Sequence, residues 1–598
     1  MKFPKSAVCR CPAILILFLG LNPFSPLSVA SPRSAVPAAD NHDGPAELPR
    51  GHVRSSLQDT PAPGQIIQVH AGEDPSAAIE QASCGDTVQL QAGATFSELV
   101  LPAKKCDDAH WVIVRTSAPD SKLPFEGTRL TPCYAGVSSL PGRPAFSCAS
   151  PENVLAKIEF QKKTGNGPVV IARGANHYRL IGLEVTRAES LGVVANLIGP
   201  EKEAADHLIF DRMWIHGTAQ SETTRGIMLS HLRYVAVVDS YLNDFHCIGN
   251  CVDSQALAGG SGDDPMGPWK IDNNFLEAAA ECILLGGSEA TATPADIEIR
   301  HNHFFKPMNW MKGQPGFVGG SDGTPFIVKN LFEMKNGQRV LLEGNIMENT
   351  WGGFSQPGTA ILLGPKNQAI GPSSVCPTCQ VTDITIRYNI IRHVGGGFQI
   401  GNGVNAHGAA AKDGGRYSIH DDVIDDIQAE RYNGRGLFAQ ISTAAGETAA
   451  IPLHDITIDH LTAFPPRVLF NIGGPRTNPQ MDRLTITNSI FMAAAVTSTG
   501  GGKERNCAAG PGSRFLDNVL HSCFTSYRFD HNVIIGGGSD WPKGNPTPKN
   551  MADAGLSEDA SAGSYRLSEH SKFKHAGLDG KDPGADFDEI ERETKGVL

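Results

Sequence analysis

The 598-residue chain has 40% hydrophobic residues, 65 glycines, 40 prolines and a formal net charge of −12. This composition is typical of a globular protein with many turns, and the glycines follow no collagen-like period. The acidic balance disfavours nucleic-acid binding, because nucleic-acid binders are normally basic. A site for an anionic ligand would need a local cluster of basic residues.

The first 30 residues are typical of a secretory signal peptide. Lys2, Lys5 and Arg10 flank the start of the apolar run AILILFLGL, and SVA ends at Ala30 as a cleavage site. This run is too short to span a bilayer, and no other run is a candidate. We therefore expect an exported monomer, periplasmic or extracellular, without a transmembrane segment. Residues 31–65 are rich in Pro, Ala and Ser, which predicts a disordered linker.

Export permits disulfides, and two of the 13 cysteines lie inside the signal segment. The spacing of the others predicts four local pairs: Cys84–Cys106, Cys133–Cys148, Cys376–Cys379 and Cys507–Cys523. Cys247, Cys251 and Cys282 then compete, and one thiol is left over. The CPTC motif has no second half at zinc spacing, so a loop clip or inert thiols are favoured.

An amphipathic helix is predicted from about Pro75 to Ala82, followed by the turn GDTV and a strand. A helix laid across the first coil of a solenoid would cover its open edge.

Alternating apolar and polar residues then recur in ADIEIRHNHFF, VLLEGNIME, ITIRYNIIR, LTITNSIFM and YRFDHNVII. This period predicts strands. The last apolar residue before each turn gives eleven repeats: Leu180, Phe210, Val237, Ile271, Ile299, Leu342, Ile386, Ile419, Ile458, Ile486 and Phe529. Repeats of varying length favour a solenoid over a propeller. We predict an all-β fold, a single-stranded right-handed parallel β-helix over residues 66–535, with an N-terminal capping helix and a C-terminal cap or tail at 536–598.

The residue three positions after the aligned one is often asparagine, as at Asn274, Asn302, Asn345, Asn389 and Asn532. Stacked asparagines in equivalent turns can hydrogen-bond from coil to coil. The string HNH at 301–303 is therefore predicted to be part of a turn ladder, with no transition metal held by both of its histidines.

The segment AAIEQASCGDTVQLQAGATF resembles the first coil of secreted right-handed β-helices of the pectin-lyase-like superfamily, which includes polysaccharide lyases. DIEIRHNHFFKPMNW, VKNLFEMKNGQRVLLEGNIMENTW and GTAILLGPKNQ are similar to a bacterial family of β-helix repeat proteins. The resemblance runs from about Ile66 to the end and implies the fold, while the narrower family implies no activity. The spaced aspartates and RIK-type signature of polygalacturonases and an obvious RxPxxR motif of pectate lyases are absent, which weakens both assignments.

Counting past the turn predicts a column of Glu277, Lys306 and Glu348 on one edge, with Lys306 between the two carboxylates. Such alternation suits an ion-pair ladder. The long loops that follow would wall a groove beside it. His303, Lys306, Trp310, Glu277 and Trp351 are accordingly candidate substrate contacts, while incidental surface positions or loop packing are the alternatives.

The segment VKNLFEMKNGQR gathers Lys329, Glu333, Lys335 and Arg339. It is the local basic patch that an acidic protein needs for an anionic sugar, so these four are candidate catalytic residues. A solvated strand with ion pairs is the alternative.

Asp244, Asp253 and Glu281 come from successive coils and are candidate calcium ligands, because calcium prefers hard oxygen ligands. The alternative is a loop clipped by a disulfide.

These features predict a protein that acts on an extracellular polysaccharide, preferably a lyase on uronate-containing glycans. Lyase chemistry needs a base, a cation that neutralises the uronate carboxylate, and an acid for the leaving oxygen. A non-catalytic carbohydrate-binding or cell-surface protein is one alternative. A glycoside hydrolase, which needs a pair of carboxyls, or an epimerase is another.

Overall fold

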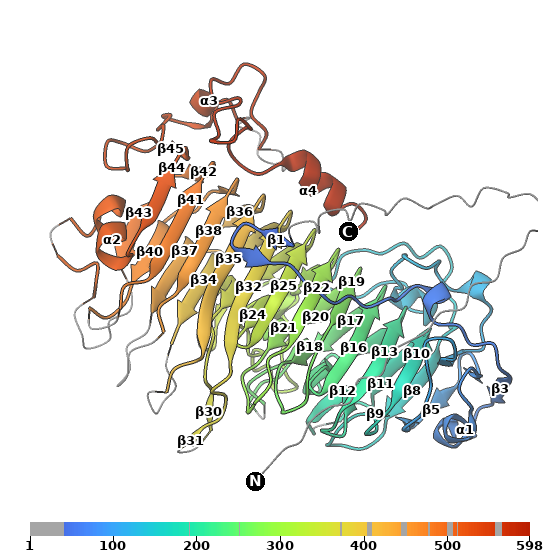
Figure 1. Cartoon of the computed structure of the whole chain (residues 1–598). Coiled ribbons are helices and arrows are strands. Elements are labelled where there is room, and N and C mark those ends of the chain that lie inside the picture. Colours follow the sequence, from blue (N-terminus) through green and yellow to red (C-terminus); the bar gives the residue numbers. More distant parts are fainter. Residues whose placement is uncertain are drawn as a thin grey trace, which may run out of the picture. The chain divides into compact units, whose positions relative to one another are not determined.

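The computed structural model describes residues 41–598, apart from 191, 250, 371–372, 404–408, 444–450, 477–478, 499–505, 511 and 557–564. The described residues form three long parallel sheets, in which each strand pairs with its counterpart one coil away. The chain passes from sheet 1 to sheet 2 to sheet 3 and back to sheet 1 in every complete coil. This is the predicted right-handed parallel β-helix, and Figure 1 shows its strands stacked in sequence order.

Sheet 1 consists of β3 (Ile66–Val69), β4 (Thr87–Leu90), β7 (Val112–Thr116), β10 (Asn176–Ile181), β13 (Ala205–Asp211), β16 (Leu232–Val238), β19 (Trp269–Asp272), β22 (Ala295–Arg300), β25 (Gly337–Glu343), β32 (Gln380–Arg387), β35 (Asp413–His420), β38 (His454–Asp459), β41 (Asp482–Thr487) and β44 (Tyr527–Asp530).

Sheet 2 consists of β5 (Thr95–Phe96), β8 (Ala156–Phe160), β11 (Leu183–Arg187), β14 (Trp214–His216), β17 (Tyr241–Phe245), β20 (Phe275–Ala278), β23 (His303–Phe305), β26 (Ile346–Thr350), β33 (Ile390–Val394), β36 (Val423–Ile427), β39 (Thr462–Ala463), β42 (Ile490–Met492) and β45 (Val533–Ile535).

Sheet 3 consists of β6 (Leu99–Leu101), β9 (Val169–Ile171), β12 (Val194–Pro200), β15 (Thr223–Met228), β18 (Gln255–Gly259), β21 (Glu281–Leu285), β24 (Phe332–Met334), β29 (Thr359–Leu363), β34 (Gly396–Asn402), β37 (Leu437–Thr443), β40 (Val468–Gly473) and β43 (Ala495–Ser498).

Short elements decorate these coils. The small hairpins are β1 (His42–Asp43) with β2 (Ala46–Glu47), β27 (Gly352–Gly353) with β28 (Gln356–Pro357), and β30 (Ala369–Ile370) with β31 (Ser373–Ser374). The helices are η1 (Leu57–Asp59), α1 (Pro75–Gln81), η2 (Asp120–Lys122), η3 (Pro132–Tyr134), η4 (Met308–Trp310), α2 (Leu516–Cys523), α3 (Met551–Ala554) and α4 (Phe587–Glu593). No helix of the described residues is long and apolar enough to cross a membrane.

The repeat register predicted from the sequence is confirmed. Each of the eleven aligned apolar residues pairs with the next one in sheet 1, from Leu180 with Phe210 to Ile486 with Phe529. These residues line the interior and belong to one continuous apolar cluster. The sheet also extends upstream, because Leu180 pairs with Val114 and Val114 with Val88.

The asparagine ladder is confirmed as well. The backbone N–H of Asn274 donates to Oδ1 of Asn302 at 2.9 Å, and the same bond joins Asn302 to Asn345 and Asn345 to Asn389. Asn389 in turn donates to Asp422. These side chains are fully buried in the turns between sheets 1 and 2. Burial is acceptable because the amides satisfy one another from coil to coil.

The two ends of the β-helix are covered. At the N-terminal end, α1 packs beside β6 and buries Ile79, as predicted. At the C-terminal end, the segment after β45 pairs with the last strand, because N–H of Ile534 donates to the carbonyl of Pro546 at 2.9 Å and N–H of Gly536 to that of Pro548 at 2.7 Å.

The linker prediction is wrong for residues 41–65, which we call the N-terminal strap, and residues 31–40 lie outside the described part. The strap runs across sheet 1 from β35 back towards β10 (Figure 1). Asp43 accepts from Arg387 at 2.7 Å, N–H of Arg50 donates to Asp296 at 3.0 Å, and Arg179 donates to the carbonyl of Ser55 at 2.9 Å. Charged outward residues of sheet 1 therefore fix a segment whose composition suggested disorder.

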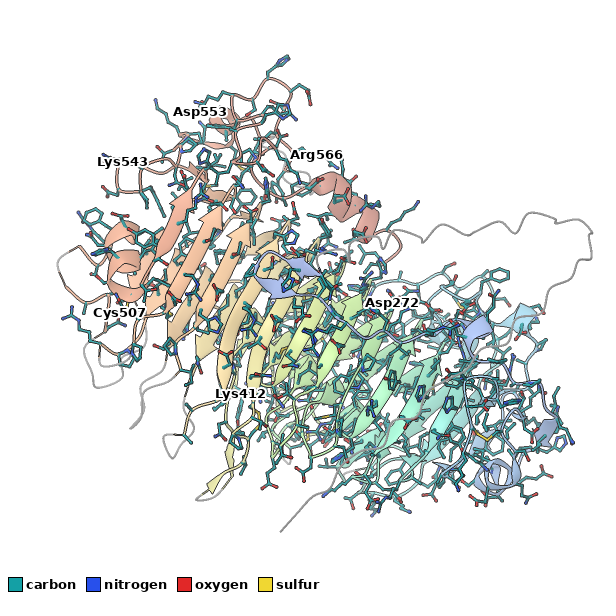
Figure 2. All side chains as sticks on the ribbon, in the orientation of Figure 1. Asp272, Lys412, Cys507, Lys543, Asp553 and Arg566 are labelled. Carbon is teal, nitrogen blue, oxygen red and sulfur yellow. A yellow bond between two sulfur atoms is a disulfide. The ribbon has the colours of Figure 1, made fainter. Side chains whose placement is uncertain are left out.

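The C-terminal segment does more than cap the last coil. Residues 565–598, the C-terminal tail, return along the turns that join sheets 1 and 2. N–H of Gly584 donates to the carbonyl of Asn488 at 2.7 Å, and much earlier in the β-helix Arg129 donates to the carbonyl of Val597 at 2.7 Å. In Figure 2, Arg566 marks the start of this tail and Asp553 the preceding α3.

The four predicted disulfides are present, and Cys247 pairs with Cys251, which leaves Cys282 as a buried free thiol. The Cys507–Cys523 bond attaches α2 to the segment before it.

Candidate functional site

A groove of about 430 Å³ runs over sheet 3. It crosses β12, β15, β18 and β21 and the turns after them, and its lining includes Asn196, Arg225, His231, Asp253, Leu284 and Glu289. Because it crosses successive coils, an extended ligand in it would lie across the strands.

Register brings polar residues together at one end of the groove. Arg225 pairs with Gln255, and Gln255 with Glu281, so three adjacent coils present them in one row. The next coil contributes Glu333, whose neighbours Phe332 and Met334 both point into the apolar core. The alternation of a strand therefore directs Glu333 outward.

Five residues form what we call the acid–lysine cluster: Asp253, Glu281, Lys329, Glu333 and Lys335. The ammonium of Lys329 pairs with Asp253 and lies 3.6 Å from Glu281. The ammonium of Lys335 lies 2.9 Å from Glu333. Two further amides support the acids, because Gln255 donates to Glu281 at 2.8 Å and Asn330 donates to Glu333 at 2.6 Å.

The cluster borders the groove. Asp253 lines it directly, and Lys335 lies against its glycine turn, where a Cβ built on Gly287 would be 3.5 Å from Nζ of Lys335. Gly286 and Gly287 both have positive φ, at 90° and 97°, which glycine adopts without strain. The glycine pair thus leaves room for the lysine beside the groove.

The acids and lysines of the cluster shift one another's pKa values. Burial, reinforced by the charge of Glu333, raises the pKa of Glu281 to about 7. Burial disfavours the charged form of Lys329, but the nearby Glu281 and Asp253 keep its pKa above the ordinary value. Burial also lowers the pKa of Lys335, but the neighbouring Glu333 raises it above the ordinary value. Both lysines are therefore cations at neutral pH, while Glu281 exchanges a proton there.

Several buried oxygens at the cluster have no hydrogen-bond donor among the described residues. They are Oε1 of Gln255, Oε1 of Glu281 and Oδ1 of Asn330. Uncharged and carboxylate oxygens of this kind are the ligands that calcium prefers. With Asp253 alongside, these are the oxygens of the cluster that a cation could use, although the ammonium of Lys329 already pairs with Asp253.

One wall of the groove carries a histidine–aspartate pair. Nδ1 of His231 lies 2.8 Å from Oδ2 of Asp264, and the imidazole lines the groove. The aspartate bonds Nδ1, so Nε2 is the other nitrogen that a ligand could contact. His231 has φ of 68°, an unusual conformation for a non-glycine residue. Gly262 packs against the imidazole so closely that a Cβ there would lie 2.3 Å from the ring.

No protein-family model matches the chain, and no curated protein matches it. Among solved structures, a pectate lyase, Pel9A, is similar at 12% identity over 89% of this chain and 98% of that one, with a TM-score of 0.38. The catalytic domain of a GH87 α-1,3-glucanase in complex with nigerose is similar at 10% identity over 81% and 70%, with a TM-score of 0.46. A PL6 family alginate lyase, AlyGC, is similar at 12% over 89% and 58%, with a TM-score of 0.44.

The fold is a parallel β-helix, as the pairing of its three sheets shows. Likenesses this distant concern the fold alone, so the argument about chemistry rests on the residues of this chain.

Residues from two predicted sites lie together in the structure. Lys329, Glu333 and Lys335 were predicted as catalytic, and Asp253 and Glu281 as metal ligands, and all five meet in the acid–lysine cluster. Arg339 is elsewhere, because it lies on β25 in sheet 1 and bonds Asp296 at 2.6 Å. Asp244 is elsewhere too, on β17 in sheet 2, where it pairs with Arg143.

The five predicted substrate contacts lie under covering loops. Glu277 binds Arg143 at 2.7 Å, and His303 binds Glu348 at 2.6 Å. Trp310 and Trp351 belong to a separate buried cluster with Phe326 and Tyr432. None of the five exposes more than 4% of its surface. A glycan on the surface would not touch them. The predicted groove is therefore absent at these five residues, which instead pack inside the protein.

The expected place of Lys306 between two carboxylates is also corrected. The register aligns Phe305, rather than Lys306, with Glu277 and Glu348. Lys306 is fully buried, and its ammonium donates to the carbonyls of Ala278, Ala279 and Ala280.

Sequence reasoning missed Arg225 and the pair His231–Asp264. Aligning the glycine-ended strands would have placed Arg225 beside Gln255 and Glu281. The histidine–aspartate pair joins two different turns, and no repeat pattern predicts that contact.

Proposed function

We propose that this protein is an exported polysaccharide-active β-helix protein, and that it is a lyase on uronate-containing glycans acting in the groove over sheet 3. The observation that carries the proposal is the convergence of Lys329, Lys335 and Arg225 beside that groove, in a chain of net charge −12. An acidic protein repels a polyuronate at long range, so binding would rely on these three cations, although both lysines already pair with acids of the cluster. The five disulfides support export to an oxidising compartment.

The residues can be given roles in a β-elimination. In this reaction a base removes the proton at C5 of the uronate, the C4–O bond breaks, a C4–C5 double bond forms, and the leaving oxygen takes up a proton. Lys329 and Arg225 would neutralise the uronate carboxylate. Lys335, held in its protonated form, is suited to give the proton to the leaving oxygen. His231 is suited to take the C5 proton through Nε2, because Asp264 bonds Nδ1 and orients the ring.

Calcium can join this site. Asp253 and Glu281, with the free oxygens of Gln255 and Asn330, would hold it. When bound, the ion would supply further positive charge for the uronate carboxylate. Asp244 has no part in this set.

The test is an assay of the purified, processed protein on a panel of acidic and neutral polysaccharides, with calcium or with chelator, following the absorbance of unsaturated products. We expect product from a polyuronate. Lys335→Ala should lower turnover by about 100-fold or more, as loss of a positioned acid usually does. Lys335 pairs with the buried Glu333, so the variant should also lose some stability, and turnover is compared at a temperature where both proteins are folded.

Lys270→Ala is the matched control, because Lys270 pairs with Asp272 at 3.5 Å on sheet 1, away from the groove. It should keep full turnover. New reducing ends without unsaturated product would point to a hydrolase that uses the three carboxyls of the cluster. Binding of a polyuronate without turnover would point to a carbohydrate-binding protein.

A further inference from the structure

A column of aromatic rings lies on the outward face of sheet 1, near the N-terminal end of the β-helix. His177 on β10 stacks on His207 on β13, with ring centroids 4.3 Å apart and planes 5° apart. Tyr234 on β16 continues the stack at 4.6 Å. The register explains the column, because the preceding residues Asn176 and Asp206 pair with each other. The edge of Trp111 contacts His177 at 4.9 Å and closes one end.

A loop brings a carboxylate to these histidines. Asp108 lies just before β7, and its Oδ1 is 3.2 Å from Nε2 of His177. The loop is fixed by the disulfide between Cys84 and Cys106, which ends two residues before Asp108. One potential ligand atom from each of Asp108, His177 and His207 lies within 4.8 Å of the other two.

The second histidine is oriented by its own carboxylate. Nδ1 of His207 lies 2.6 Å from Oδ1 of Asp206, so Nε2 is left as the nitrogen for a ligand. Metal-binding histidines are commonly oriented by a carboxylate in this way.

We propose that Asp108, His177 and His207 form a site for a divalent transition metal, with zinc as the ion that best suits two imidazoles and one carboxylate. Three protein ligands leave the fourth position of a tetrahedral zinc to water. The stacked rings must turn about their Cβ–Cγ bonds, because a metal ion binds in the plane of an imidazole. The Asp108 side chain is 80% exposed and can follow.

The site is separate from the groove over sheet 3 and does not depend on the proposed function. A bound ion would fasten the loop before β7 to two neighbouring coils. The adjoining pocket of about 160 Å³, lined in part by Trp111 and Tyr234, provides room beside the ligands.

The test is titration of the metal-free, processed protein with Zn²⁺ by calorimetry, and with Co²⁺ by visible absorption. We expect one equivalent of either metal, a higher melting temperature with zinc, and the absorption of four-coordinate Co²⁺. Asp108→Asn and His207→Gln should each weaken zinc binding by at least about tenfold, and Asp206→Asn by a similar factor, because even orienting residues contribute that much.

His454→Gln is the matched control, because His454 on β38 also bonds two aspartates, Asp413 and Asp455, at 2.9 and 2.8 Å. It should leave zinc affinity unchanged. Asp108→Asn keeps the test valid if a histidine variant does not fold, because this side chain lies at the surface. Absence of stoichiometric zinc binding, or equal affinity in the wild type and Asp108→Asn, would overturn the proposal.

Discussion

The Nζ atom of Lys306 is buried inside the protein and is surrounded by backbone carbonyls. Its ammonium has three N–H donors, and the three carbonyls of Ala278, Ala279 and Ala280 accept at 2.7, 3.0 and 2.7 Å. Burial lowers its pKa, because the charged form is costly to desolvate. The residue stabilises the turn between β20 and β21 by bonding its consecutive carbonyls.

We expect Lys306→Met to lower the free energy of unfolding by about 3–5 kcal/mol, because a side chain of similar length would remove the Lys306 donors from three buried carbonyls. Urea unfolding measures the change. Lys270→Met, at a partly exposed position, should change stability by about 0.5 kcal/mol or less. A loss below about 1 kcal/mol for Lys306→Met would mean that water or a backbone shift replaces the ammonium.

The candidate site was predictable in part at this scale. Lys329, Glu333 and Lys335 were identified in the sequence because one short segment contains several charged residues. The stacking of coils then places them beside Asp253 and Glu281. The burial of Lys306 was not predictable, because a count of three or four residues past a turn cannot separate Phe305 from Lys306. The packing of Trp310 likewise depends on Phe326 and Tyr432, which come from distant parts of the chain.

Among the elements, the turn ladder contains one acid among its amides. Asp422 accepts two bonds from Asn389 through Oδ1, while its buried Oδ2 has no hydrogen-bond partner among the described residues. Burial raises the pKa of Asp422 to about 7. An asparagine there could donate to the carbonyl of Ile386, as Asn389 does to that of Leu342.

Asp422→Asn is therefore expected to stabilise the protein, and more at pH 8 than at pH 4. The folded pKa of about 7 lies above the unfolded value near 4, so the wild type loses stability as pH rises between them. The difference between the two pH values should be on the order of 2–4 kcal/mol. Urea unfolding of both proteins at pH 4, 6 and 8 measures it. A pH-independent difference would show that Asp422 ionises freely in the folded state.

The eleven repeat positions were predictable because each coil buries an apolar residue in sheet 1, and most of these residues precede a ladder turn. The strands of the first coils were not included in the predicted repeats, for a physical reason. Their turns lack the ladder asparagine, and β5 has only two residues, Thr95–Phe96. Long segments interrupt the strands there, so alternation alone did not reveal β4 and β7 as members of the same sheet.

On the scale of the whole described unit, both chain ends run back over the β-helix. The N-terminal strap bonds charged residues of sheet 1, where Asp421 and Asp43 raise the pKa of His420 to about 10 against its burial. The C-terminal tail instead covers apolar residues. Tyr565, Leu567, Phe573, Phe587 and Ile590 of the tail pack on outward residues of sheet 2, including Val423, Ile490 and Val533. The composition of each segment gave no sign of these contacts.

Deleting residues 565–598 is expected to lower the melting temperature by several degrees and to create binding of a hydrophobic dye. Removing the tail exposes the outward apolar strip of sheet 2, and each such side chain contributes about 1.5–3 kcal/mol when fully buried. A contiguous exposed strip also favours association. Thermal scanning and dye fluorescence measure both effects. Deleting Leu598 alone is the control, because this residue is 70% exposed.

The same truncation separates the tail from the proposed chemistry. The tail contacts sheet 2 and the ladder turns, whereas the acid–lysine cluster lies on sheet 3. Truncated protein that remains folded at low temperature should therefore turn over glycan at the wild-type rate. A melting temperature unchanged from the wild type, without dye binding, would contradict a structural role for the tail. Loss of turnover in protein that remains folded would show that the tail influences the groove over sheet 3.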